Sequence, residues 1–380
     1  MSMHSPPPKT APPAPIHQIN VMLVDDSAVI RSLMHRILSD DPSIKVLASA
    51  ANGEVAVQLL QRSDVHVIVL DIEMPVMDGL AAIPKLLAID PDVKIIMAST
   101  LTVRNAEISL KALELGASDY IPKPSSSREI SAEGHFRHDL LTKVRSHGQR
   151  PRRRPRRAGL DAPHALGSTA PKPTAPRKVE LRKAGTMRPY VLAVGSSTGG
   201  PQALFTFLQA LPASLTVPIL VTQHMPPTFT AVLAQHIGRV ANRPCHEAVD
   251  GETLKPGTIY IAPGDHHMTV EGSGRNLTIR LNQGPPENFC RPSVDPMLRS
   301  LVQAVGARLL TVILTGMGSD GLAGSSKVVD AGGTVLAQDE ATSVVWGMPG
   351  AVATAGLCAA VLPLPQLAPH VAQMFERAVP

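Results

Sequence analysis

The chain has 380 residues, which suits two domains of roughly 100–200 residues each better than one. Hydrophobic residues make up 44% of the sequence and aromatic residues only 3%, so the cores must be aliphatic, and no apolar run reaches the ~20 residues of a membrane span. The formal net charge of +5 is local: residues 137–188 hold fifteen Lys or Arg and three Asp or Glu, a charge of +12, which leaves −7 for the rest of the chain.

The segment 1–17 is rich in proline and lacks the apolar core of a signal peptide, so we expect a disordered tail rather than a membrane-inserted or secreted leader. The three cysteines, Cys245, Cys290 and Cys358, form no close pair and no metal-ligand spacing. A reduced, cytoplasmic location is the simplest interpretation.

Residues 18–125 alternate between strand and helix patterns. Apolar runs predict strands at Ile19–Val24, Lys45–Ala48, Val65–Leu70, Val93–Met97 and Asp119–Ile121. Helical spacing predicts helices at Ser27–Ser39, Gly53–Gln61, Leu80–Ala88 and Asn105–Leu115, the third interrupted and kinked at Pro84. This alternation implies a parallel sheet with right-handed crossovers.

Polar residues stand where these strands end, namely at Asp25, Asp26, Asp71, Ser99 and Lys123. Ligand sites in such sheets lie beyond the carboxyl ends of the strands, so we expect these side chains to converge. Clustered carboxylates repel unless a hard cation such as Mg²⁺ lies among them, and a carboxylate beside that ion can form an aspartyl phosphate. Taken singly, an Asp pair could be a helix cap and a lysine could be solvated, but their joint placement favours a site.

The motifs that carry these residues resemble a two-component response-regulator receiver domain over 18–125; they are Val24–Ser27, Leu70–Pro75, Asp78–Leu80, Ser99 and Lys123–Pro124. The resemblance implies phosphorylation of Asp71 by a histidine kinase. It also implies Mg²⁺ held by Asp25, Asp26, Asp71 and the backbone carbonyl of Glu73. The residues that would report phosphorylation are Ser99, Tyr120 and Lys123.

The segment 126–187 is basic and rich in proline and arginine, a composition that predicts a disordered linker, with a helix possible at Phe136–Val144. The alternative is an arm that binds nucleic acid or an anionic surface. Because no aromatic residue is interleaved for base stacking, we favour the linker and expect no nucleic-acid binding.

The segment 188–380 again reads as α/β, mixed in places. Strands are expected at Tyr190–Val194, Pro218–Thr222, Thr258–Ile261, Asn276–Leu281, Leu309–Leu314 and Gly333–Ala337. Helices are expected at Gln202–Ala210, Pro296–Val305 and Ser325–Asp330, among others.

The stretch Gly195–Gly200 fits the pattern Gly-x-Ser-x-Gly, with Ser197 in the middle of a strand–turn–helix. Such a turn lifts a serine hydroxyl off the sheet and turns helix N–H groups toward an oxyanion; on this pattern alone, a plain capped turn explains the residues equally well. His224 and Asp320 also follow apolar runs, and serine, histidine and aspartate at one sheet edge suit acyl transfer. Competing bases that follow no apolar run are His246, His266 and His267.

The second unit resembles the CheB family of chemotaxis protein-glutamate methylesterases, through Gly195–Gly200, Thr222–Pro227, Ile261–Asp265, His267–Met268, Arg291–Asp295, Leu314–Gly321 and Trp346–Pro349. The matching motifs imply Ser197 as nucleophile, His224 as general base and acid, and Asp320 as the orienting carboxylate. Backbone groups at Thr198 and Met317 are the oxyanion candidates. Ser196 stands where we expect alanine, which leaves a second hydroxyl beside the nucleophile.

Together the two resemblances imply two doubly wound parallel-sheet α/β domains: a flavodoxin-like receiver at 18–125 and a Rossmann-like methylesterase, with some antiparallel strands, at 188–380. The implied activity is hydrolysis of glutamate methyl esters on methyl-accepting chemotaxis receptors, with methanol release, and deamidation of receptor glutamines, without a cofactor for these steps. The unphosphorylated receiver is expected to cover the esterase site. Alternatives are a DNA-binding regulator, although no helix-turn-helix pattern is found, and an esterase-fold scaffold with a lost or changed substrate.

Overall fold

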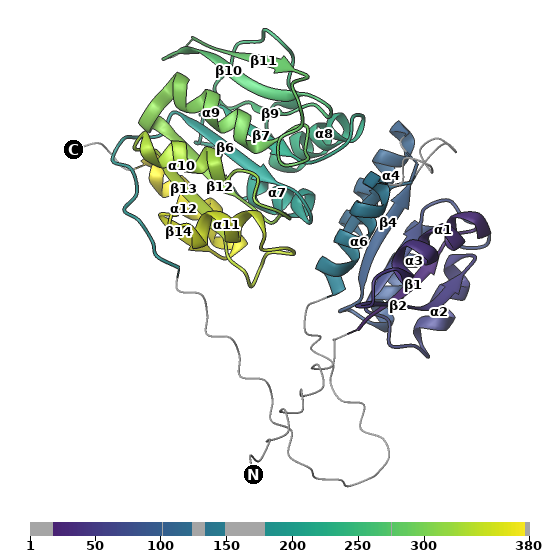
Figure 1. The fold of residues 1–380 in the computed structure, drawn as a ribbon. Helices are drawn as coiled ribbons and strands as arrows, with labels where there is room; N and C mark the ends of the chain where they lie inside the picture. The colour runs from purple at the N-terminus through teal and green to yellow at the C-terminus, as the bar shows by residue number, and fades with distance from the viewer. Residues whose placement is uncertain (1–17, 101, 124–133, 149–178, 275, 377–380) are drawn as a thin grey trace, which may run out of the picture.

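The computed structural model describes residues 18–100, 102–123, 134–148, 179–274 and 276–376 (Figure 1). The expected tail at 1–17 and most of the expected linker, 126–133 and 149–178, lie outside the described residues, as do residues 124–125 at the end of the expected receiver. None of the described helices is long and apolar enough to cross a membrane.

The first unit is a five-stranded sheet with the parallel strand order β2-β1-β3-β4-β5. Its strands are β1 (Ile19–Val24), β2 (Ile44–Ala50), β3 (Val67–Asp71), β4 (Lys94–Ser99) and β5 (Asp119–Pro122). Its helices are α1 (Ala28–Ser39), α2 (Gly53–Leu60), α3 (Gly79–Ile89), α4 (Val103–Glu114) and α6 (Gly134–Gly148). The order reverses between β1 and β3, and ligands of open parallel sheets bind at such a point.

Two expectations for this unit need correction. Helix α3 runs without interruption through Pro84, because the buried side chains of Ile83 and Leu86 hold it to the sheet although proline removes one backbone hydrogen bond. Helix α6 falls in the range assigned to the linker, yet Leu140 and Val144 are fully buried in the core with the strands, so this helix belongs to the first unit.

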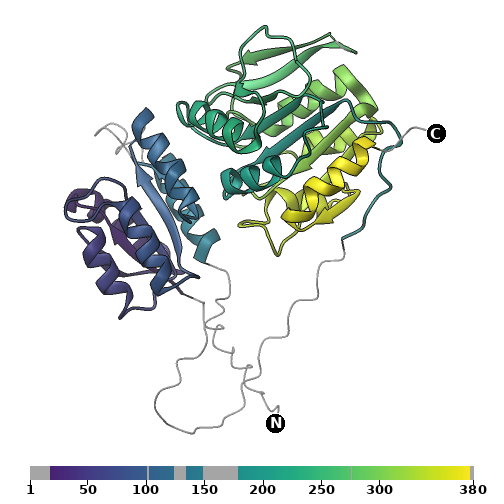
Figure 2. The ribbon, with the colours of Figure 1, turned by 180° about the vertical axis from the view of Figure 1, so that it is seen from behind.

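The second unit is a seven-stranded, all-parallel sheet in the order β14-β13-β12-β6-β7-β9-β8. Its strands are β6 (Val191–Ser196), β7 (Ile219–Gln223), β8 (Cys245–Glu247), β9 (Ile259–Ile261), β12 (Leu309–Ile313), β13 (Thr334–Gln338) and β14 (Ala360–Leu362). Its helices are α7 (Gly200–Gln209), α8 (Phe229–Ala241), α9 (Val294–Val305), α10 (Leu322–Asp330), α11 (Met348–Thr354) and α12 (Leu364–Glu376). From behind, helices are seen to flank both sheets (Figure 2).

The antiparallel strands expected in this unit form a separate two-stranded sheet, β10 (His267–Ser273) with β11 (Asn276–Asn282). The main sheet itself is not mixed. Its chain starts in the middle at β6, builds outward through β7, and then returns to the other side of β6 with β12. The second unit therefore has its own reversal point, between β6 and β12.

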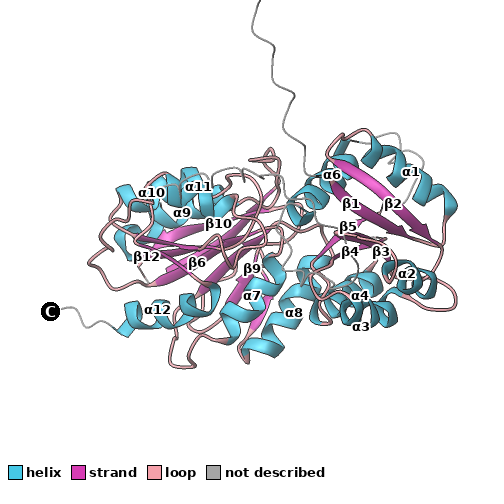
Figure 3. Ribbon diagram, turned by 90° about the horizontal axis from the view of Figure 1, so that it is seen from below, coloured by secondary structure: helices cyan, strands magenta, loops and turns pink. Residues whose placement is uncertain are grey.

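The two units meet where α4 faces α7 and α8 (Figures 1 and 3). Gln202 Nε2 donates to the carbonyl oxygens of Leu113 and Ala117, at 2.9 and 2.7 Å. The rings of Tyr120 and Phe229 stack with centroids 4.8 Å apart and planes 13° apart. Polar and aromatic contacts thus fasten the end of α4 and the start of β5 to the second unit.

Candidate functional site

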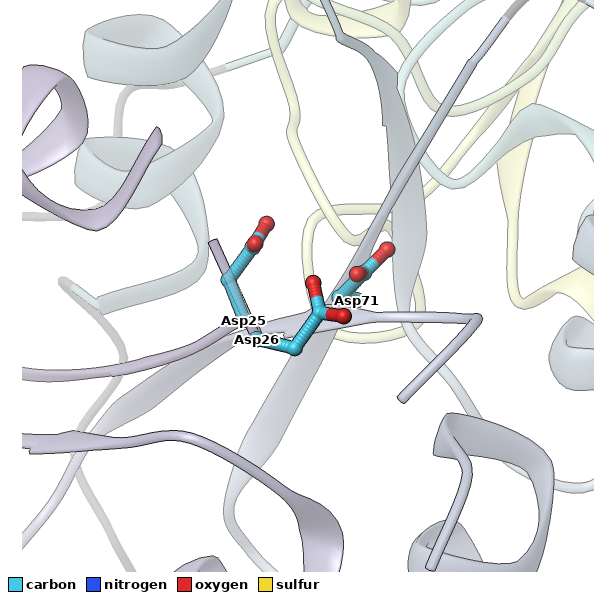
Figure 4. Close-up of side chains that lie close together, drawn as sticks. All are labelled: Asp25, Asp26 and Asp71. Carbon is cyan, nitrogen blue, oxygen red and sulfur yellow. The ribbon is translucent and has the colours of Figure 1, made fainter. Parts of the chain in front are cut away.

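Three carboxylates lie together at the reversal point of the first sheet. Asp25 and Asp26 follow β1, Asp71 ends β3, and each offers an oxygen within 4.8 Å of the others. Their carboxylates project to the same side of the sheet edge (Figure 4). The sequence-based convergence of these three residues is therefore seen in the structure.

Lys123 joins this cluster, because its Nζ lies 2.6 Å from both Asp25 Oδ2 and Asp71 Oδ1. One ammonium does not balance three carboxylates, so the negative charge that remains suits a divalent cation with oxygen ligands. Burial raises the pKa of Asp71, although the ion pair with Lys123 acts in the opposite direction. The residues present therefore fit Mg²⁺ held by carboxylate oxygens.

Ser99 and Tyr120 contact residues outside the carboxylate cluster. The Ser99 hydroxyl is buried 3.1 Å from that of Ser109, in α4. Tyr120 is buried against Phe229, and burial raises the pKa of its phenol well above the ordinary value. Ser99 therefore connects β4 to α4, and Tyr120 connects β5 to the second unit.

In the second unit, Ser197 and His224 follow neighbouring strands in register. Ser196, the last residue of β6, pairs with Gln223, the last residue of β7, and adjacent strands lie about 4.8 Å apart. Gln223 Nε2 donates to the carbonyl oxygens of both Ser197 and His224, at 2.9 and 3.1 Å. This amide holds the two loops side by side at the sheet edge.

The two neighbouring serines are distinguished by burial. Ser196 is completely buried, and its hydroxyl donates to Gln223 Oε1 at 2.7 Å. Ser197 is partly exposed and begins the turn into α7. Of the two serines, only Ser197 has exposed surface.

His224 has partners on both ring nitrogens. Its Nε2 lies 2.7 Å from Asp320 Oδ2, and its Nδ1 lies 3.3 Å from Cys290 Sγ. Burial alone would lower the pKa of His224, but the hydrogen bonds with Asp320 and Cys290 outweigh it and raise the pKa to about 10. Among the described residues, no hydrogen bond joins His224 to Ser197 in this conformation.

Asp320 is held by six donors. Besides His224, these are Asn288 Nδ2, Ser293 Oγ and the backbone N–H groups of Val294, Asp295 and Gly321. Val294 and Asp295 form the first turn of α9, whose N-terminus favours negative charge. Burial would raise the pKa of Asp320, but these donors lower it to about 2.

Glycines permit the close approach of the catalytic loops. Gly199 has φ +72°, and a Cβ there would lie 2.5 Å from a Val344 methyl group. A Cβ on Gly316 would lie 2.3 Å from Met348 Sδ and 2.9 Å from Ser197 Cβ. The loop after β12 therefore touches the serine only because residue 316 has no side chain.

The competing histidines have other partners. His246 pairs with Glu252 at 2.8 Å, and His266 Nδ1 lies 3.3 Å from the Gly264 carbonyl oxygen. His267 is buried in β10, where Nε2 contacts the Pro285 carbonyl oxygen and Nδ1 accepts from Ser293 N. Among the described residues, none of these three histidines makes a hydrogen bond to Ser197 or Asp320.

Sequence reasoning missed several residues that hold this site, chiefly Gln223, Asn288, Cys290 and Ser293. Gln223 stands at a strand end like His224, and Ser293 lies in the motif Arg291–Asp295, so both positions were usable signals. Asn288 and Cys290 act through contacts between segments far apart in the chain, and no local pattern predicts those contacts.

Comparisons with known proteins find a family match in each of the two units. Residues 21–133 match the response regulator receiver domain and residues 192–371 match the CheB methylesterase family. The chain is therefore a response regulator whose output unit is an α/β domain of enzyme type.

The relatives extend the match over nearly the whole chain. The protein-glutamate methylesterase/protein-glutamine glutaminase 1 of Paramagnetospirillum magneticum is 53% identical over 386 residues, 99% of this chain and 100% of that protein. The corresponding protein of Azospirillum brasilense is 55% identical, over 95% of this chain and 93% of its own. The crystal structure of the Thermotoga maritima CheB methylesterase catalytic domain is 39% identical, covers 50% of this chain and 100% of its own, and has a TM-score of 0.48.

With relatives of this identity and coverage, the chain belongs to the CheB methylesterase family. The family and the α/β fold class predicted from sequence are both confirmed.

Proposed function

We propose that this protein is a phosphorylation-controlled protein-glutamate methylesterase and protein-glutamine glutaminase that acts on chemoreceptors. The observation that carries the proposal is the meeting of Ser197, His224 and Asp320 around one sheet edge, where the strand order reverses between β6 and β12. Their roles are nucleophile, general base and acid, and orienting carboxylate, in that order.

In the proposed reaction the Ser197 hydroxyl attacks the carbonyl carbon of a glutamate methyl ester while His224 takes its proton. His224 then returns the proton to the departing methoxide, and methanol leaves. Water, deprotonated by the same histidine, hydrolyses the acyl-enzyme. With a glutamine substrate the same steps release ammonia.

The tetrahedral intermediate needs N–H donors for its oxyanion. Thr198 N–H and Met317 N–H have no hydrogen-bond acceptor among the described residues, which leaves both groups free for that task. Both lie beside Ser197, since Thr198 follows it in the chain and Gly316 packs on its Cβ. These contacts support the two residues as oxyanion donors.

In the first unit, Asp71 is the proposed phosphoryl acceptor and a histidine kinase the proposed donor. Mg²⁺ would be held by Asp25, Asp26, Asp71 and the Glu73 backbone carbonyl, and when bound it would neutralise phosphoryl oxygens. Lys123, already 2.6 Å from Asp71 Oδ1, would pair with a phosphoryl oxygen. A pocket of about 390 Å³ beside Asp26 gives a phosphodonor room to approach.

The contact between the units offers a route for control. Ser99 and Tyr120 are the proposed switch residues, and they connect the phosphorylation site to α4 and to Phe229 of α8. Helices α7 and α8 begin shortly after Ser197 and His224. Movement of α4 and β5 on phosphorylation would therefore reach the helices that carry the catalytic loops.

Methanol release from methylated receptors tests the proposed function. We expect a small phosphodonor to stimulate wild type and to leave the basal rate of Asp71→Ala unchanged. Exposed Asp40→Ala is the control, since Asp40 follows the far end of α1 and pairs with Arg137 at 2.8 Å, and it should keep the stimulation. Receptor binding without methanol release would favour the scaffold alternative, and equal stimulation of Asp71→Ala would exclude Asp71 as the acceptor.

A further inference from the structure

One short turn carries a residue that contacts His224 and a residue that contacts Asp320, and it also exposes an aromatic ring. Glu287 and Cys290 exchange two backbone hydrogen bonds, of 3.1 and 2.9 Å, across Asn288 and Phe289. Both central residues have positive φ, 52° and 63°. This is the backbone of a two-residue hairpin turn, in which glycine is preferred at the position that Phe289 occupies.

The Phe289 side chain does not stabilise the folded protein at this position. Its side chain is 95% exposed, so burial contributes no hydrophobic free energy. Its left-handed backbone is disfavoured for any residue with a Cβ, and most for bulky ones. Strained residues of this kind persist where the surrounding structure fixes them, typically at functional sites.

The residues on either side of Phe289 reach into the catalytic centre. Asn288 Nδ2 donates to Asp320 Oδ1 at 3.0 Å, and Cys290 Sγ lies 3.3 Å from His224 Nδ1. Consecutive Cα atoms are 3.8 Å apart, so the Phe289 backbone lies within one residue of the groups that contact the catalytic pair. A protein substrate that brings an ester to His224 would therefore come close to this turn.

The turn is also firmly anchored. Arg299, in α9, makes two hydrogen bonds to the Glu287 carboxylate, at 2.8 and 2.5 Å. On the other side, Arg291 pairs with Asp265 at 2.5 Å and donates to the Gly284 carbonyl oxygen. An aromatic side chain on a fixed backbone loses little entropy on binding, which is typical of the residues that dominate protein interfaces.

We propose that Phe289 is a specificity-determining residue that contacts the receptor, by packing on an apolar side chain next to the modified glutamate. On a receptor helix, side chains three or four residues from the glutamate lie on the same face, at a distance that the ring can span. Met317, 38% exposed in the loop that packs on Ser197, would provide a second apolar contact, and in this conformation its Sδ lies 4.0 Å from Ser146 Oγ of α6. This inference rests on the proposed function, because it names the substrate contact of the same site.

The test compares Phe289→Gly, Phe289→Leu and wild type in the full chain, with phosphodonor and methylated receptor in membranes. We expect Phe289→Gly to raise KM about tenfold with kcat within twofold, since uniform binding is lost, and Phe289→Leu to restore most of it. The Tm of Phe289→Gly should not fall, because the turn prefers glycine. Val249→Ala, which trims another exposed apolar residue of the same unit, should leave KM unchanged.

An unchanged KM for Phe289→Gly, or a fall in kcat alone, overturns the inference. The Kd for receptor, measured without turnover, separates this inference from the proposed function. If wild type binds receptor but releases no methanol, the proposed function fails. The inference is then tested by whether Phe289→Gly weakens receptor binding. If wild type does neither, both fail. Binding to receptor-free lipid vesicles that depends on Phe289 would replace the receptor by a membrane and also overturn the inference.

Discussion

Both candidate sites lie where the strand order of a parallel sheet reverses, yet the pKa values of Asp320 and Asp71 are shifted in opposite directions. Asp320 accepts six hydrogen bonds, and its pKa falls to about 2 although burial would raise it. At the other site burial raises the pKa of Asp71, and Lys123 is shared with Asp25. A carboxylate with its oxygens occupied can orient a histidine, whereas one that shares a single lysine can take an ion and a phosphoryl group.

The largest expected effect concerns Ser197, the proposed nucleophile of the site that contains Asp320. Ser197→Ala should lower kcat for methanol release roughly 10⁴- to 10⁶-fold, because the nucleophile is lost. Ser196→Ala is the matched control: its hydroxyl is buried on Gln223, so its loss should affect the melting temperature more than kcat. A larger loss of kcat in the Ser196 variant would mean that the nucleophile is misassigned.

The next largest effect is expected when the Asp320 carboxylate loses its charge but keeps its shape. Asp320→Asn should lower kcat about 10³- to 10⁴-fold, because His224 loses the partner that fixes its tautomer and stabilises its cation. It should also lower the free energy of unfolding by about 1–3 kcal/mol, since an amide nitrogen faces groups that are all donors. Both are measurable, by steady-state methanol release and by chemical denaturation.

Asp295→Asn is the control for this variant. Asp295 stands in the same first turn of α9, but its carboxylate accepts from Gly324 N and Asn288 Nδ2 and not from His224. It should therefore keep at least a tenth of wild-type kcat. If both variants lose activity equally, Asp320 acts through the packing of α9 and not through the histidine.

The sequence predicted those parts of both sites that depend on strand ends. Asp71, His224 and Asp320 each follow an apolar run, and the alternation of strands and helices brings such positions to one edge. The turn 287–290 was not predicted, and the helix expected at Phe136–Val144 was assigned to the linker and not to the first unit. Asn288 and Cys290 contact the site through Asp320 and His224, 32 and 66 positions away, and no local pattern predicts those contacts. The basic composition of α6 hides its two core residues.

A smaller effect is expected where the two regions touch. Gln202→Ala removes two hydrogen bonds to the carbonyl oxygens of Leu113 and Ala117, each contributing about 1 kcal/mol. If the receiver restrains the esterase through this contact, methanol release without phosphodonor should rise about three- to tenfold, with less stimulation by phosphodonor. Gln303→Ala, on the exposed side of α9, should change neither rate.

The smallest effect is a shift in pH dependence. It isolates the contribution of Cys290 to the pKa of His224 from that of Asp320. Burial would lower the pKa of His224, and Asp320 and Cys290 together raise it to about 10. His224 must be neutral to accept a proton, so kcat/KM should rise with pH along a limb above the ordinary value of 6.5. Cys290→Ala removes one of the groups that stabilise the cation, so the limb should move to lower pH by roughly half a unit to one unit.

Cys245→Ala supplies the matched control for this shift, because Cys245 is a half-buried thiol whose Sγ has no contact with His224 among the described residues. Its pH profile should coincide with that of wild type. A limb that stays in place in Cys290→Ala would leave Asp320 as the only group that raises the pKa of His224. The contrast between the two sites would then lie in the aspartates alone. A shift of the pH profile in Cys290→Ala would show that the turn 287–290 raises the pKa of His224 through Cys290. The same turn would then serve both substrate contact, through Phe289, and proton transfer.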